Sequence, residues 1–348
     1  MGMRKIGMYG GKFIPVHMGH VYAMIKASTM VEELHVVVSY DEEYEKEHYY
    51  HHSHIEPIPY KIRLRWWKQI TKNLPHVHVH AIYEPQTGEF SDWELGAERI
   101  KAAVGKPIDT VFSSENAYGE YFAKLYPDAE HMMIDSARSV YPISATKIRT
   151  EGPLKHWEML PKFVQSYFVK KIVIVGTESC GKSTLVKNLA TLYNTAHVEE
   201  WGRTYYERLG TYETLESDFP EIAFEHQYQI KEQLKKANKL LFIDTEALVT
   251  QFFSIAYEGK TQPVLNEIAK LQQFDLWLFL EPDVDWIDDG TRVFGEEKVR
   301  QTNNDILKSL LEEAGIQTIS ISGSYQERLE KAMEEVNKLL GVNGLQVS

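Results

Sequence analysis

Short apolar runs alternate with stretches of helical spacing along the whole chain. In the first half, the runs at 5–10, 34–40, 76–84, 108–115 and 131–135 are typical of strands, and helix-like stretches separate them. The second half repeats this alternation, with strands expected at 171–176, 196–200, 240–246, 276–282 and 316–323. Strands that alternate with helices favour an α/β architecture with mostly parallel sheets.

The alternation is interrupted in the middle of the chain. Glu151-Gly152-Pro153 breaks the pattern, and residues 154–170 have the spacing of a helix broken at Pro161. The length of 348 residues also exceeds the size at which one hydrophobic core usually stops growing. We therefore predict two α/β domains, residues 1–168 and 169–348.

Composition limits the partners that this chain is expected to have. The net charge of −12 argues against a surface that coats nucleic acid, because such binding depends on Lys and Arg that neutralise phosphates. Small phosphorylated ligands need only a few positive groups and oriented amides in a cleft. The single cysteine, Cys180, excludes an internal disulfide framework. No apolar signal core or run of about eighteen apolar residues occurs, so we expect a cytoplasmic protein without a membrane partner.

The strongest motif is GTESCGKST at 176–184, which fits G-x-x-x-x-G-K-[ST] between an expected strand and an expected helix. Glycines let the loop turn its amides toward phosphate, while Lys182 reaches the β- and γ-phosphates and Ser183 ligates Mg²⁺. A chance glycine turn is the alternative, but the context favours a nucleotide site. Cys180 is either a small filler or a thiol whose pKa the helix amides lower.

Acidic residues follow two expected strands of the same domain. Asp244 closes an apolar run and is the expected Mg²⁺ partner, although strand-end acids are also common helix caps. In Glu199-Glu200-Trp201, we expect one carboxylate to accept a proton from a substrate hydroxyl, and we narrowly favour Glu200 over Glu199 for this role. Trp201 offers a flat face to a ring. The alternative is a solvated acidic strand end with a tryptophan in the core.

The segment 288–300, DDGTRVFGEEKVR, is polar and follows another expected strand. We interpret it as a mobile lid in which Arg292 or Arg300 neutralises charge on the transferred phosphoryl group. Ordinary surface loops have the same composition.

Two histidines, His17 and His20, follow the first expected strand in MYGGKFIPVHMGH. Zinc is one interpretation, but catalytic zinc needs three protein ligands and no H-E-x-x-H arrangement is present. A second interpretation is that both are ordinary buried imidazoles of the core. Their position at the start of an expected helix favours phosphate binding. PISATKIR at 142–149 offers a second helix start with Ser144, Thr146, Lys147 and Arg149. The role of His48, His51, His52 and His54, in an expected exposed loop, stays open.

The motifs G-x-F-x-P-x-H-x-G-H and I-S-x-T-x-x-R resemble the nucleotidyltransferase superfamily. With DSARSVYPISATKIR and the P-loop that follows, nearly the whole chain resembles NadR-type bifunctional nicotinamide-nucleotide adenylyltransferase/ribosylnicotinamide kinases. Members that repress transcription carry an N-terminal helix-turn-helix segment, whereas this sequence begins almost at its first expected strand. We therefore expect no DNA-binding repression and no nucleic-acid partner.

The resemblance implies that residues 1–168 form a Rossmann-like domain that joins nicotinamide mononucleotide to the α-phosphorus of ATP, releasing pyrophosphate and NAD. This step needs alignment and charge neutralisation rather than a protein nucleophile. The implied ATP contacts are Gly10, Gly11, Phe13, His17, His20, Ser144, Thr146 and Arg149. The implied nicotinamide-nucleotide contacts are Lys12, Trp93, Ser114, Glu115, Tyr118, Asp135 and Arg138, with a structural ion pair as the alternative for the last two. Trp66 and Trp67 are rivals for ring stacking that core packing would also explain.

By the same resemblance, residues 169–348 form a P-loop kinase domain that phosphorylates the 5′-hydroxyl of nicotinamide riboside. Its implied ATP contacts are Gly176, Glu178, Ser179, Gly181, Lys182, Ser183, Thr184 and Arg292, and its riboside contacts are Glu199, Glu200, Trp201 and Asp244. The catalytic set of the whole chain is His17, His20, Arg149, Lys182, Glu200 and Arg292, with Ser183 and Asp244 holding Mg²⁺ as cofactor. ATP is a co-substrate, the partners are small molecules, and a homo-oligomer stays open. The alternatives are a phosphopantetheine-type adenylyltransferase fused to another nucleoside kinase, and a non-catalytic NAD or ATP sensor.

Overall fold

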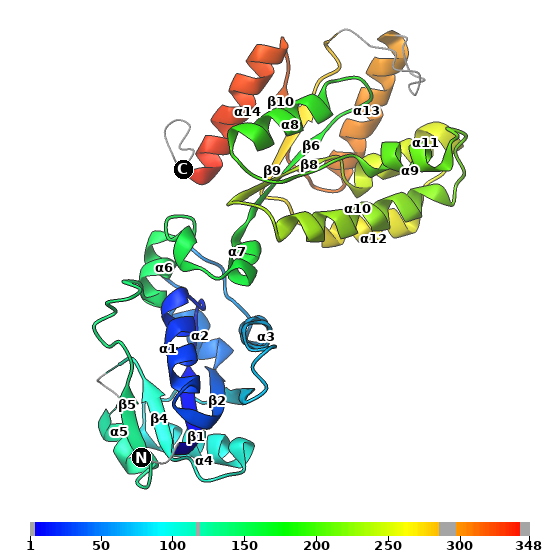
Figure 1. The fold of residues 1–348 in the computed structure, drawn as a ribbon. Coiled ribbons are helices and arrows are strands. Elements are labelled where there is room, and N and C mark those ends of the chain that lie inside the picture. Colours follow the sequence, from blue (N-terminus) through cyan, green and yellow to red (C-terminus); the bar gives the residue numbers. More distant parts are fainter. Residues whose placement is uncertain (1–3, 116–118, 285–296, 342–348) are drawn as a thin grey trace. The chain divides into compact units, whose positions relative to one another are not determined.

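A computed structural model describes residues 4–115, 119–284 and 297–341 of the chain. The chain divides into two compact units, residues 1–168 and 169–348, both of α/β architecture (Figure 1). Each unit is built on a parallel sheet, so the fold class expected from the alternation of apolar runs and helices is confirmed.

The first unit has a five-stranded sheet in the order β3-β2-β1-β4-β5, and every pairing is parallel. Its strands are β1 (Arg4–Gly11), β2 (Val31–Tyr40), β3 (Val77–Tyr83), β4 (Thr110–Ser113) and β5 (Glu130–Met133). Its α-helices are α1 (Met18–Ser28), α2 (Glu42–His48), α3 (Tyr60–Ile70), α4 (Phe90–Val104), α5 (Gly119–Leu125) and α6 (Ala145–Glu151). The chain leaves β1 on one side and returns to β4 on the other, and such a switch point opens a crevice at the carboxyl ends of the strands.

The core of this unit contains both tryptophans that were rivals for ring stacking. Trp66 and Trp67 are buried on α3, and the Trp67 ring packs edge-on against Phe13 at 4.8 Å between centroids. Core packing therefore accounts for both residues. A second apolar cluster joins α4 to β1, β2 and β3 through residues such as Ile100, Val37 and Ile82.

The two units are joined by the expected broken helix. A 3₁₀ turn, η2 (Trp157–Met159), precedes α7 (Lys162–Phe168), and Pro161 separates them. Proline has no N–H to donate, so it is tolerated just before a helix and not inside one.

The second unit has a parallel sheet in the order β10-β9-β6-β8-β7. Its strands are β6 (Lys170–Val175), β7 (His197–Val198), β8 (Leu240–Asp244), β9 (Leu276–Leu280) and β10 (Ile319–Ile321). Its helices are α8 (Lys182–Leu192), α9 (Trp201–Leu209), α10 (Asp218–Leu234), α11 (Ala247–Glu258), α12 (Pro263–Leu271), α13 (Glu297–Glu313) and α14 (Tyr325–Leu340). The central strands β6 and β8 are buried, as expected for a sheet covered on both faces.

Helices cover this second sheet in two groups. An apolar cluster holds α8 and α14 against the sheet, with Leu189, Val336 and Phe242 fully buried in it (Figure 1). A separate cluster packs α10, α11 and α12 together through Phe219, Ala247 and Leu265. The strand expected at 196–200 is shorter than predicted, because Glu199 and Glu200 already belong to the turn into α9.

Candidate functional site

A cavity of about 450 Å³ opens at the carboxyl ends of β1, β2 and β4 in the first unit. The β1–α1 turn, the end of β4 and the start of α6 contribute to its lining. Of the residues expected to bind nucleotides in this domain, it brings together Gly10, Gly11, Lys12, Phe13, His17, His20, Trp93, Ser114, Glu115, Asp135, Arg138, Ser144, Thr146 and Arg149. Tyr118 lies outside the described residues.

His17 and His20 cap the start of α1 reciprocally. The backbone N–H of His20 donates to Nδ1 of His17, and the backbone N–H of His17 donates to Nδ1 of His20, each at 3.4 Å. The two rings are stacked with 3.6 Å between their centroids. A nitrogen that accepts a hydrogen bond carries no proton, so each neutral ring carries its proton on Nε2. Both rings thus have an N–H donor on Nε2.

Burial and nearby positive charge keep both imidazoles neutral. Burial, and then the charge of Arg138, lowers the pKa of His17 to about 3. Burial also lowers the pKa of His20 well below its usual value, with smaller contributions from His17 and Arg138. The pair can therefore offer hydrogen-bond donors to an anion, and it does not offer two fixed positive charges.

The second helix start in the cavity carries a fixed guanidinium. Ser144 caps α6 by accepting a hydrogen bond from the N–H of Lys147. Arg149, which is almost fully buried, donates to the carbonyl of Ile14 at 2.7 Å and to Oγ1 of Thr146 at 3.1 Å. These two bonds join α6 to the β1–α1 turn, so the two motifs found in the sequence form one wall of the cavity.

Lys12 lines the same cavity, and its carbonyl contacts a buried ion pair. Its Nζ atom is buried and has no hydrogen-bond partner among the described residues. Burial lowers the pKa of Lys12, and the charges of Glu45 and Glu84 oppose that effect. In this ion pair, Arg63 on α3 binds Glu45 on α2 with both terminal nitrogens, at 3.1 and 2.7 Å. Arg63 also donates to the carbonyl of Lys12 at 2.7 Å.

Replacing Arg63 with methionine should destabilise the first unit by about 3–5 kcal/mol, because it leaves the Glu45 carboxylate buried without its partner. Urea unfolding followed by tryptophan fluorescence measures this change. Arg65→Met is the matched control, since Arg65 is exposed on the same helix. Equal stability of the two variants would contradict the role of the buried pair.

The ion pair considered for Asp135 and Arg138 is not present. Asp135 instead accepts hydrogen bonds from the N–H and hydroxyl of Ser139, while the guanidinium of Arg138 binds Glu115 at 2.6 Å. Asp135 therefore holds the turn that contains Arg138. Glu115 follows β4, so the ion pair joins the two segments at the edge of the cavity.

In the second unit, a cavity of about 170 Å³ lies between the P-loop and helices α9, α10 and α11. The P-loop contributes Glu178, Ser179, Gly181, Lys182, Ser183 and Thr184, and α9 begins beside it with Glu200 and Trp201. Gly176 starts the loop with a φ of +148°, and a Cβ there would lie 2.7 Å from the carbonyl oxygen of Leu280, so only glycine fits. Nζ of Lys182 is held by the carbonyl of Thr177 at 2.8 Å.

Ser183 and Asp244 meet at the carboxyl ends of β6 and β8. The Ser183 hydroxyl donates to one carboxylate oxygen of Asp244 at 2.5 Å, while the other carboxylate oxygen is buried without a partner among the described residues. Burial, and then the charge of Glu200, raises the pKa of Asp244 to about 6 against the opposing effect of Lys182. A hydroxyl beside an unsatisfied carboxylate is the oxygen donor set that Mg²⁺ prefers. The helix cap considered for Asp244 is provided instead by Glu246, which accepts from the N–H groups of Leu248 and Val249.

The structure separates the two acids that precede α9. Glu200 lines the cavity, whereas Glu199 is largely exposed and pairs with Lys187 on α8 at 2.8 Å. Glu199 is therefore not among the residues brought together at this site. Trp201 is half-buried at the cavity, with the guanidinium of Arg208 4.7 Å from its ring centroid.

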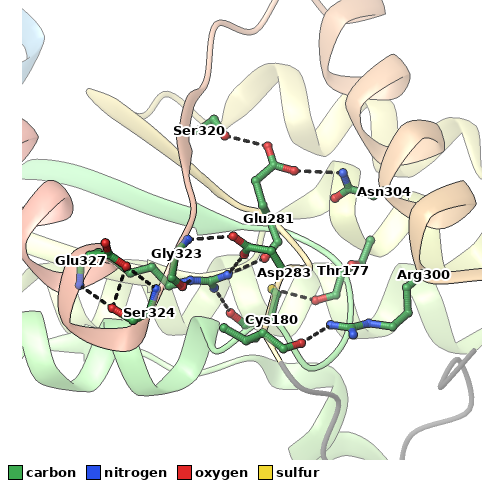
Figure 2. Close-up of polar contacts among 12 residues, drawn as sticks. Thr177, Cys180, Glu281, Asp283, Arg300, Asn304, Ser320, Gly323, Ser324 and Glu327 are labelled. Atoms are coloured by element: carbon green, nitrogen blue, oxygen red, sulfur yellow. Dashed lines mark hydrogen bonds and ion pairs between the residues drawn. The ribbon is translucent and has the colours of Figure 1, made fainter. Parts of the chain in front are cut away.

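The P-loop is fastened to the strands behind it. Cys180 is fully buried and donates to the carbonyl of Thr177, and burial raises the pKa of its thiol, so the alternative of a lowered pKa is wrong (Figure 2). Arg328 on α14 donates to the carbonyl of Cys180 and pairs with Asp283. Asp283 also accepts from the N–H of Gly323 at 2.7 Å (Figure 2). One buried guanidinium thus links the P-loop to the ends of β9 and β10.

Only part of the expected lid can be placed. Residues 285–296, and Arg292 with them, lie outside the described residues. Arg300 lies in the first turn of α13 and donates to the carbonyl of Val284 at 2.9 Å. It is not among the described residues that line the cavity.

Sequence reasoning missed the helical side of the second cavity. Phe219, Ile222 and His226 on α10, and Phe253 and Tyr257 on α11, line it. Their spacing of three or four residues is the only signal, and it predicts a common helix face without saying that this face borders a cavity. Burial lowers the pKa of His226 to about 4, so its imidazole is uncharged.

Comparisons with known proteins cover both units. A family model described as cytidylyltransferase-like matches residues 8–151, and one described as an AAA domain matches residues 171–328. In overall structure, the chain matches a NadR protein in complex with NR (TM-score 0.82, 23% identity, 100% of this chain and 99% of the other). It also matches a NadR protein in complex with NAD and AMP-PNP (TM-score 0.81, 23% identity, 99% and 98%). None of the described helices is long and apolar enough to cross a membrane.

Two curated relatives share more of the sequence. The trifunctional NAD biosynthesis/regulator protein NadR of Escherichia coli (strain K12) is 32% identical over 346 residues, which are 97% of this chain and 84% of that protein. The protein of the same description from Salmonella typhimurium is 32% identical over 349 residues, covering 98% and 85%. Similarity of this extent, across both units and their motifs, shows that the chain belongs to the NadR family of NAD biosynthesis/regulator proteins.

Proposed function

We propose that this chain is a bifunctional enzyme that converts nicotinamide riboside to nicotinamide mononucleotide and then to NAD, using ATP in both steps. One observation carries the proposal: the chain holds two phosphate-binding sites of different construction, a histidine-capped helix start and a P-loop. Relatives described as NAD biosynthesis proteins, and NadR structures with NR or with NAD and AMP-PNP, support these substrates.

In the kinase step, the 5′-hydroxyl of the riboside attacks the γ-phosphorus of ATP, and ADP leaves. Glu200 is the carboxylate that takes the hydroxyl proton, since it lines the cavity whereas Glu199 pairs with Lys187 on the surface. Lys182 and the P-loop amides bind the phosphate oxygens. Ser183 and Asp244 would hold Mg²⁺, which when bound neutralises charge on the β- and γ-phosphates.

In the adenylyltransferase step, a phosphate oxygen of the mononucleotide attacks the α-phosphorus of ATP, and pyrophosphate leaves. The nucleophile is already an anion, so the protein need only align the two phosphates and stabilise the added charge. The Nε2–H groups of His17 and His20 donate to phosphate oxygens from one helix start, and Thr146 and Arg149 bind from the other. Lys12 adds a positive group from the β1–α1 turn.

Incubating the purified protein with Mg²⁺-ATP and nicotinamide riboside should yield the mononucleotide first and NAD later, together with ADP and pyrophosphate. Mass spectrometry of samples taken over time measures all four products. Phosphopantetheine and other nucleosides, offered separately, test the alternative substrates. Absence of both pyridine products while ATP and Mg²⁺ are in excess would contradict the proposed function and favour a sensor.

A further inference from the structure

Glu84 is a carboxylate at the cavity of the first unit that the proposed chemistry does not use. It follows directly after β3, and its backbone N–H donates to the carbonyl of Tyr40 at the end of β2, at 3.0 Å. Its side chain contributes to the lining of the cavity. The end of β3 thus brings a negative charge to the cavity in which the mononucleotide is proposed to bind.

A glycine of α4 makes the space for this carboxylate. Gly96 is buried inside the helix, where glycine is normally less favourable than alanine. A Cβ at this position would lie 3.1 Å from Cγ and 3.2 Å from Oε1 of Glu84. Alanine would therefore displace the Glu84 side chain, and this contact gives a packing reason for glycine at the site.

The same face of α4 borders the cavity and locates the carboxylate along the substrate. Trp93 and Ala97 line the cavity, and residues three or four apart on a helix share a face. Gly96 is three residues from Trp93, so the Glu84 carboxylate packs about one turn from the indole. Trp93 is the residue expected to contact the nicotinamide ring. Strand β2 separates β3 from β1, which leads to the phosphate-binding histidines, so Glu84 lies at the ring end of the mononucleotide.

The described cations that act on Glu84 do not bind it directly. They are Lys12 and Arg99. Nζ of Lys12 has no hydrogen-bond partner among the described residues, and the guanidinium of Arg99 donates to the carbonyl of Tyr83 and lies over its ring. Burial raises the pKa of Glu84, and the Lys12 charge and the Ser39 hydroxyl oppose that effect. A largely buried carboxylate in this setting is stabilised by a ligand that brings positive charge or N–H donors.

The ring end of nicotinamide mononucleotide supplies both. Its pyridinium ring is positively charged, and its carboxamide has an NH₂ group that donates hydrogen bonds. Asp92, another acid that lines the cavity, is already engaged by the N–H groups of Thr87 and Gly88 at 2.6 and 3.0 Å. In the acid analogue, nicotinic acid mononucleotide, a carboxylate replaces the amide. That group offers no donor and brings a second negative charge toward Glu84.

We propose that the Glu84 carboxylate makes the adenylyltransferase selective for the amide form of the mononucleotide, because it accepts a hydrogen bond from the carboxamide and repels the carboxylate of the acid form. The inference rests on the proposed adenylyltransferase function and adds a specificity-determining residue to it. Gly96 is a positioning residue that keeps the space for the carboxylate open. Selectivity of this kind combines attraction for one ligand with repulsion of its analogue.

The test measures kcat/KM for the amide and the acid mononucleotide at saturating Mg²⁺-ATP. Glu84→Gln keeps the length of the side chain and an acceptor oxygen but removes the charge. The wild type should prefer the amide form by about 100-fold, and Glu84→Gln should raise kcat/KM for the acid form and lower the preference by about tenfold or more. Glu98→Gln is the matched control, because Glu98 is exposed on α4, and it should keep the preference of the wild type.

Gly96→Ala tests the same contact from the helix. The added Cβ should displace the Glu84 carboxylate and lower the preference for the amide form in the otherwise wild-type chain. In the Glu84→Gln background, the same change should have little further effect on the preference, because the charge that it displaces is already absent. KM for ATP and phosphorylation of the riboside should stay unchanged in every variant, and thermal unfolding checks that each is folded.

Equal use of the two mononucleotides by the wild type would overturn the inference and leave the proposed function intact. Equal losses on both mononucleotides in folded Glu84→Gln protein would do the same, because they would show that the carboxylate only supports the cavity. If neither mononucleotide is adenylylated while the riboside is still phosphorylated, the proposed adenylyltransferase function is wrong and the inference falls with it.

Discussion

Lys182→Ala should lower the phosphorylation of nicotinamide riboside by about 10³-fold while leaving the conversion of nicotinamide mononucleotide to NAD unchanged. Nζ of Lys182 is held at the P-loop, 2.8 Å from the carbonyl of Thr177. Burial disfavours its positive charge, but the surrounding groups, including the Glu200 and Asp244 carboxylates, raise its pKa overall. It therefore stays charged at neutral pH, and alanine removes the positive group that faces the β- and γ-phosphates. Separate assays with riboside and with mononucleotide measure the two steps.

Lys187→Ala is the matched control for this prediction. Lys187 lies one turn further along α8, and its ammonium pairs with Glu199 on the surface. Its loss should leave both activities close to those of the wild type. A similar loss in Lys187→Ala, or loss of NAD synthesis from mononucleotide in folded Lys182→Ala protein, would contradict the assignment of the P-loop to the kinase step alone.

His20→Ala should have the converse effect. We expect NAD formation from mononucleotide to fall by about 10²- to 10³-fold, because one preorganised donor to the reacting phosphates is lost. Phosphorylation of the riboside should stay unchanged, since it uses the other unit. Following pyrophosphate release with mononucleotide and ATP as substrates measures the first effect, and ADP formation with the riboside measures the second.

The capping role of His20 must be separated from its role as a donor. Its Nδ1 accepts the N–H of His17, so alanine also removes one of the two reciprocal capping bonds. His20→Glu retains an acceptor at this position, as in an ordinary capping box, but brings a negative charge in place of the Nε2–H donor. It should unfold at a temperature closer to that of the wild type and still be inactive in NAD formation. Activity near the wild-type level in the glutamate variant would refute the donor role.

The fold and the location of both sites could be predicted from the sequence because they depend on local patterns. The apolar runs at 5–10 and 240–246 were recognisable as strands, and a parallel sheet brings the carboxyl ends of its strands to one edge. Residues at the ends of such runs, such as His17 after the first run and Glu200 at the end of the run at 196–200, were therefore expected at that edge. The motif spacing then added the phosphate chemistry.

What could not be predicted depends on contacts between distant segments. Nothing in the sequence around Arg63 or Arg328 indicates that these side chains are almost fully buried, since burial is decided by the helices and strands that pack over them. The same holds for His226, whose helical spacing with Phe219 is typical of any core-facing helix. Glu199 and Glu200 are adjacent, and only the end of β7 and the start of α9 decide which one faces inward.

The reciprocal cap at the start of α1 also limits which ions the histidine pair can bind. Coordination of a transition metal requires an unprotonated ring nitrogen with a free lone pair. In both rings that lone pair is on Nδ1 and is already engaged by a main-chain amide. To ligate zinc through Nε2, each ring would have to move its proton to Nδ1 and give up its cap. Two adjacent histidines that resemble a metal-binding pair are in this way held in the tautomer that favours anions over cations.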